Sequence, residues 1–302
     1  MLSKNPALKL IASLTIILLI IISNVKYPVQ GSWQISDGTK VDYLLESANW
    51  TVYYGLDTAT GEGCRYNDIK VKPNNEFEIK VNDVDDVWGI EYEINNSTDS
   101  SIGSISTALF LLEFEHFLYY PTEECIRLFS EGFNENEISL GPNMFGWFFI
   151  EPSEALWSYF NEIIDIEYHK SRSSIFDYQA YFESFFERRE KQAIFDVNMY
   201  GDFINDTLEV DINFQHNIKF IWNDTTGILL GYRISTQFSG IFYGLSLSEE
   251  LEIVCREVDY NLPNYKFYNY TGFIPGYDFG ITVIAIFTIS ISILIFLKRK
   301  KR

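Results

Sequence analysis

The stretch that decides the fold is LEVDINFQHNIKFIW, residues 208–222. Every second residue from Leu208 onward is large and apolar except His216, and the residues between them are polar except Ile221. A period of two is typical of a β-strand that lays one face on a hydrophobic core. A strand of this length would extend about 50 Å, so we expect it to bend or to contain a bulge.

Alternating stretches also lie on both sides of residues 208–222. They are EFEIKV (76–81), VWGIEYEI (87–94), FDVNM (195–199), ILLGYRISTQF (228–238) and LSLSEELEIVC (245–255). The polar runs NNSTDSS (95–101) and NDTTG (223–227) predict loops, and Asp37-Gly38 is a strong hairpin signal. Together these patterns predict a curved antiparallel sheet.

Two stretches instead have the period of an amphipathic helix. Residues 153–164 place apolar side chains on one face after Ser153, a good N-cap, and residues 177–191 do so after Asp177. Residues 104–120 are so apolar that helix and strand remain equally open. We therefore predict an α+β fold in which a β-rich, half-barrel-like antiparallel sheet is covered by two or three amphipathic helices.

The two ends of the chain indicate a membrane context. Residues 10–22 are a short apolar run behind Lys4 and Lys9, typical of a secretory signal, although an uncleaved anchor stays open. Residues 279–297 carry no charge, are long enough to span a bilayer, and precede five consecutive cations at 298–302. The expected organisation is a signal peptide or signal anchor (1–30), an extracellular domain (31–270), and a linker, transmembrane helix and cytoplasmic basic tail (271–302).

The charge distribution agrees with this division. Residues 31–278 hold all 42 acidic side chains but 15 of the 23 basic ones, a net charge of −27. Such an acidic domain is a poor partner for nucleic acid, whose phosphates are bound by Lys and Arg. The same part contains the Asn-x-Ser/Thr sequons expected of an exported glycoprotein, at Asn49, Asn95, Asn96, Asn205, Asn223 and Asn269.

The C-terminal end carries the motif Pro275-Gly276-Tyr277, followed by the apolar span and the basic cluster. This arrangement resembles the PGF-CTERM type of tripartite sorting signal found on exported, choice-of-anchor surface proteins of archaea, with Tyr277 where Phe is usual. The resemblance implies recognition by a membrane protease of the archaeosortase kind, removal of the tail and lipid anchoring. It covers about the last 30 residues and says nothing about the domain before them.

Motifs for catalysis and metal binding are scarce. The sequence has no GxSxG, P-loop, HExxH or CxxC pattern, so we expect neither an enzyme nor a metal or cofactor site. A carboxylate-dependent extracellular hydrolase remains the least favoured alternative. Cys64, Cys125 and Cys255 allow one disulfide bond outside the cell, and their spacing does not say which pair would form it.

The leading hypothesis is a non-enzymatic cell-surface protein held in the membrane, with an adhesion, envelope or ligand-binding role. The alternative is a tethered carrier or receptor for an apolar ligand such as a lipid, bound between sheet and helices. Its candidate ligand-binding residues lie on the apolar side of the alternating strands: Phe214, His216, Trp222 and Tyr232. The partners expected are membrane lipid, a sorting protease, and an apolar ligand or another surface protein.

Overall fold

The computed structural model describes residues 32–86, 88–130, 141–165, 167–168, 171 and 177–266. The chain divides into two compact units, residues 1–266 and 267–302, and every described residue belongs to the first. Both predicted terminal segments and the sorting motif Pro275-Gly276-Tyr277 therefore lie outside the described residues. Within those residues, no helix is long and apolar enough to cross a membrane.

A ten-stranded antiparallel sheet dominates the described part of the chain, in the order β7-β6-β5-β1-β13-β12-β11-β10-β9, with β2 paired to β1. Its strands are β1 (Lys40–Tyr54), β2 (Asp57–Glu62), β5 (Asn75–Asp85), β6 (Gly89–Asn95), β7 (Ser100–Ile105), β9 (Asp177–Arg189), β10 (Gln192–Asn205), β11 (Val210–Asn223), β12 (Leu229–Phe242) and β13 (Leu245–Glu257). The β-rich α+β prediction is thus confirmed, and the sheet is not closed.

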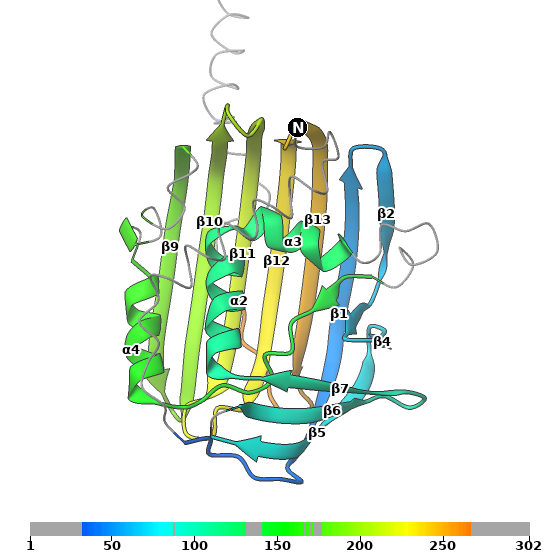
Figure 1. The fold of residues 1–302 in the computed structure, drawn as a ribbon, viewed down its shortest axis with the longest axis vertical. Helices are drawn as coiled ribbons and strands as arrows, with labels where there is room; N and C mark the ends of the chain where they lie inside the picture. Colours follow the sequence, from blue (N-terminus) through cyan, green and yellow to red (C-terminus); the bar gives the residue numbers. More distant parts are fainter. Residues whose placement is uncertain are drawn as a thin grey trace, which may run out of the picture. The chain divides into compact units, whose positions relative to one another are not determined.

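Helices cover one face of this sheet, which we call the inner face; the opposite face is the outer face (Figure 1). The helices are α2 (Thr107–Tyr119), α3 (Pro121–Ser130) and α4 (Glu154–Ile163). A second, small sheet is formed by β3 (Cys64–Tyr66), β4 (Ile69–Val71) and β8 (Asn143–Met144). Figure 1 also shows β5, β6 and β7 running across the direction of the long strands, so the sheet is strongly bent.

The long strand predicted from residues 208–222 is β11, and it contains the expected irregularity. Its pairing with β12 shifts register between Ile221 and Trp222. The first long strand, β1, pairs with the last, β13, from Tyr43 opposite Glu257 to Tyr54 opposite Leu247, with another shift between Leu45 and Ser47. The main sheet is therefore assembled from strands at opposite ends of the domain.

Side-chain caps and apolar spacing explain where the helices form. The Ser153 hydroxyl accepts a hydrogen bond from the Leu156 N–H, which confirms the predicted start of α4. The ambiguous stretch 104–120 forms α2, and Ser106 caps it in the same way. Phe110, Phe114 and Phe117 then fall on the face of α2 that packs into the core.

The prediction of a helix at residues 177–191 is wrong, because this segment forms β9. Aromatic residues at 181, 182, 185 and 186 fit a helix face, but they also alternate between the two faces of a strand, and aromatics favour strands. Phe182 lies opposite Met199 and Phe186 opposite Phe195, so both join the inner face. Arg188 and Arg189 are the last residues of β9, and Lys191 lies in the hairpin turn that follows. These cations therefore do not end a helix.

That turn, Glu190-Lys191, gives a first testable prediction. Both residues have positive φ angles, 51° and 63°, as a type I′ hairpin requires, and neither is a residue type that favours this conformation. We expect the double substitution E190N/K191G to raise the free energy of unfolding by about 1–2 kcal/mol. Urea denaturation measures the change, and E190A/K191A, which gains no tolerance for positive φ, is expected to give no increase.

Candidate functional site

The four residues predicted to bind an apolar ligand all lie in the packed core. Trp222 and Phe220 stack with ring centroids 5.4 Å apart, and Phe203 and Phe214 stack at 4.2 Å. The ring of Phe117 from α2 meets His216 edge-on at 4.9 Å. The hydroxyl of Tyr232 lies 2.5 Å from that of Tyr66. Strand, helix and small-sheet side chains thus fill the space that a ligand would need.

Two voids that the described residues line on the inner face are small. One lies between the α2–α3 junction and strands β10 to β12, and another lies between β8 and strands β11 and β12. Each has a volume of about 10 Å³, roughly what a single water molecule requires. Neither holds a lipid chain.

A buried ionic cluster joins α2 to α3. His116 contacts the carboxylates of Glu123, at 3.6 Å, and Glu124, which also accepts a hydrogen bond from Arg127. Burial alone would lower the pKa of His116, but the hydrogen bonds and charges of Glu123 and Glu124 outweigh it and raise that pKa to about 9. We interpret the cluster as a structural link between the two helices, because His116, Glu123 and Glu124 contact one another and are buried, while Arg127 closes it on the solvent side.

Another buried carboxyl group, that of Glu249, points from β13 into the inner face, where the residue is 1% exposed. The thiol of Cys125 on α3 lies near enough to influence the pKa of this carboxyl group. Burial raises the pKa of Glu249 to about 8, and the nearby Cys125 thiol offsets part of this effect. Glu249 is therefore a neutral carboxylic acid at pH 7.

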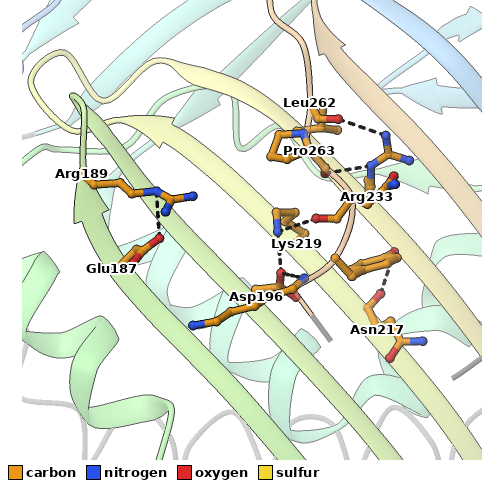
Figure 2. A network of polar contacts seen from close by, with 11 residues as sticks. Glu187, Arg189, Asp196, Asn217, Lys219, Arg233, Leu262 and Pro263 are labelled. Carbon is orange, nitrogen blue, oxygen red and sulfur yellow. Dashed lines mark hydrogen bonds and ion pairs between the residues drawn. The ribbon is translucent and has the colours of Figure 1, made fainter. Parts of the chain in front are cut away.

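The outer face carries the most extensive polar arrangement, and we treat it as the candidate functional site. After β13 the chain turns back across this face as an irregular segment, residues 258–266, which we call the strap. Figure 2 shows Arg233 of β12 reaching the strap carbonyls of Leu262 and Pro263, both at 3.2 Å. The strap thus crosses strands β12, β11 and β10 in turn.

A buried ion pair beneath the strap fixes its far end. Asp196 of β10 and Lys219 of β11 lie directly opposite each other, with 0% and 5% of their side chains exposed. Lys219 donates to Asp196 at 2.5 Å and to the strap carbonyl of Asn264 at 3.0 Å, while the Lys266 N–H donates to the same carboxylate at 2.7 Å (Figure 2). Each charge therefore binds both the sheet and the strap.

Aromatic contacts complete this attachment. The Tyr265 hydroxyl donates to the Asn217 carbonyl at 3.4 Å, and the Lys266 ammonium lies over the ring of Phe185. Nothing in the alternation of β10 and β11 distinguishes Asp196 and Lys219 from residues of a solvated face. The signal that could have revealed them is their opposite charge combined with the apolar Ile194 and Ile221 beside them on the same side.

The described sequons lie at the surface of the sheet and its loops. Asn49 is exposed on the outer face of β1, beside a shallow hollow of about 160 Å³ whose lining includes Gln237, Glu250 and Glu252. The other described sequon residues are half-buried, namely Asn95, Asn96, Asn205 and Asn223. Asn269 lies outside the described residues.

Across the described ranges, no three His, Cys, Asp or Glu side chains gather as metal ligands would. Comparisons with family models, with curated proteins and with solved structures found no match to this chain.

Proposed function

We propose that this chain is a non-enzymatic cell-surface protein whose sheet-and-helix domain is held at the membrane by its C-terminal segment and serves adhesion or envelope structure. The observation that carries the proposal is the strap. It is locked to the outer face by a buried ion pair, and its last described residue, Lys266, comes shortly before the predicted linker and transmembrane helix of residues 271–302. A last segment fixed in this way suits a domain that is attached through the residues that follow it.

The inner face supports a non-enzymatic role over a carrier role. A carrier needs a cavity of several hundred Å³ for its ligand, whereas the described voids beside Tyr119 and Trp147 are about 10 Å³ each. Catalytic acids and bases need access to a substrate. His116, Glu124 and Glu249, whose pKa values are shifted, are instead buried and packed against protein groups.

The acidic surface supports an exterior position. Residues 31–278 carry a net charge of −27, which keeps copies of the domain apart and soluble beside one another. Asn49 is exposed on its strand and so offers a position for a glycan.

The proposal is tested by comparing the full chain with a chain that ends at residue 270 and so keeps the whole strap. We expect the full chain in the membrane fraction, accessible on intact cells to a membrane-impermeant biotin reagent and to added protease. The shortened chain is expected in the medium. A full chain that fractionates with membranes but resists both reagents until the cells are lysed would contradict the exterior placement.

A further inference from the structure

Three hairpin turns lie side by side at one end of the long strands, the upper end of the sheet in Figure 1. They join β1 to β2, β10 to β11 and β12 to β13. Backbone hydrogen bonds connect the turns to one another. The Gly55 N–H donates to the Ser246 carbonyl at 2.9 Å. The Gly244 N–H donates to the Glu209 carbonyl at 3.0 Å. We call this end of the sheet the hairpin rim, which comprises residues 53–57, 205–211 and 241–246.

The hairpin rim exposes large apolar side chains. Leu56 in the β1–β2 turn is 102% exposed, and Tyr53 and Ile241 are 47% and 42% exposed. These residues lie close together, because Ile241 is opposite Ser246, which accepts the hydrogen bond from the β1–β2 turn. Apolar side chains that gather on one part of a surface mark a contact site. The backbone hydrogen bonds of the rim hold this group on a fixed frame.

The opposite end of the long strands has a different surface. Two turns lie there, between β9 and β10 and between β11 and β12. Their exposed side chains are charged or polar, as in Glu190, Lys191 and Thr225. In the described residues of these two turns, no large apolar side chain is exposed. Of the two ends, the rim is therefore the one suited to an apolar partner.

The length of chain beyond the strap allows the rim to reach a bilayer. The Lys266 N–H is bound to Asp196, and residues 197–205 carry β10 from there to the rim, a distance of about 30 Å. Residues 267–278 separate Lys266 from the uncharged span that begins at Phe279. Twelve residues extend to about 40 Å at most. A lipid surface at the start of that span is therefore within reach of the rim.

We propose that the hairpin rim docks on the lipid surface and places Leu56, Tyr53 and Ile241 in the headgroup region. The inference rests on the proposed function, because the predicted tail keeps the domain beside the bilayer. Such tethering lets three side chains suffice where a free protein would need a larger apolar surface. The amphipathic ring of tyrosine suits the headgroup level. The exposed carboxylates of Asp57 and Glu209 favour a neutral lipid surface over an anionic one.

The test uses the full chain reconstituted in phosphatidylcholine vesicles, with a nitroxide attached to L56C or to W88C. Trp88, 80% exposed in the turn between β5 and β6, is the matched control outside the rim. The three native cysteines are buried, and the unsubstituted chain gives the labelling background. Collision rates are measured with oxygen, which concentrates in lipid, and with a nickel chelate present in the water on both sides.

We expect the chelate to reach the label at position 56 roughly fivefold less often than the label at position 88, and oxygen to reach it more often. Adding Y53S/I241S to L56C should remove most of this difference, because the remaining apolar contact is small. Anionic lipid in the vesicles should also reduce it.

Equal access of the chelate to both labels would overturn the inference, and so would a shielded label at position 88 with an open one at 56. A label at 56 that neither reagent reaches would mean that protein, such as a second copy of the chain, covers the rim instead of lipid. Vesicle flotation separates the two proposals. A chain that stays with the vesicles while its rim label remains in water refutes the docking alone, whereas a chain that does not float with them refutes the tether as well.

Discussion

Replacement of Lys219 by methionine is expected to lower the free energy of unfolding by about 3–5 kcal/mol. Methionine keeps the apolar part of the side chain but leaves the Asp196 carboxylate buried without its cation, and the carbonyl of Asn264 loses its donor. Breaking a buried ion pair in this way costs more than the pair contributes, since the remaining charge is still removed from water. Urea denaturation of the full chain, followed by circular dichroism of the sheet, measures the loss.

The double variant D196N/K219M distinguishes the cost of leaving a buried charge unpaired from the cost of altered side-chain packing. It is expected to recover most of the lost stability, because the amide that replaces the Asp196 carboxylate is neutral and can still accept from the Lys266 N–H. K40M is the matched control, since Lys40 is 56% exposed in its ion pair with Glu78 and its loss should change stability little. In K219M we also expect protease to cut residues 258–266 at least tenfold faster; an unchanged rate would mean that the ion pair does not hold the strap.

Substitution of Glu249 by glutamine is expected to stabilise the protein at pH 8 and to leave it nearly unchanged at pH 5. The pKa of Glu249 is about 8 in the fold and near 4.5 in the unfolded chain. Between these values the unfolded chain loses the proton and the folded one keeps it, so stability falls as pH rises through this window and levels off above it. Over pH 5 to 8 this amounts to about 3 kcal/mol, and a neutral amide removes it.

Comparing both proteins at each pH isolates this effect, since His116 and the other titrating groups are common to both. E250Q, one residue along β13 on the exposed side, is the control and should follow the wild-type pH profile. If E249Q and wild type lose stability in parallel between pH 5 and 8, Glu249 is ionised in the fold and its environment is more polar than its burial indicates.

Much of the sheet was predictable because its strands have one solvated face. In β11, β12 and β13 the alternation of apolar and polar residues matches the buried and exposed positions closely. The Ser153 cap likewise identified the start of α4. By contrast, the sequence predicts a helix where β9 forms, because adjacent aromatic residues fit both the helical period and the strand period. Strands β3, β4 and β8 are too short for any period to appear.

The candidate site was largely missed for a different reason. Asp196 and Lys219 sit at positions that alternation assigns to solvent, and only the strap that covers them makes them buried. The strap itself has no regular period, so its path depends on contacts between residues far apart in sequence. Glu249 was detectable, because it occupies the apolar phase of β13 between Leu247 and Leu251.

The pairing of β1 with β13 sets the order of events during biogenesis. Tyr43 cannot find Glu257 until more than two hundred intervening residues have been synthesised. Until then β1 presents an unpaired backbone edge, which is a template for aggregation. The strap follows β13 directly in the chain. It can therefore cover Asp196 and Lys219 only after β13 has been made and can pair with β1.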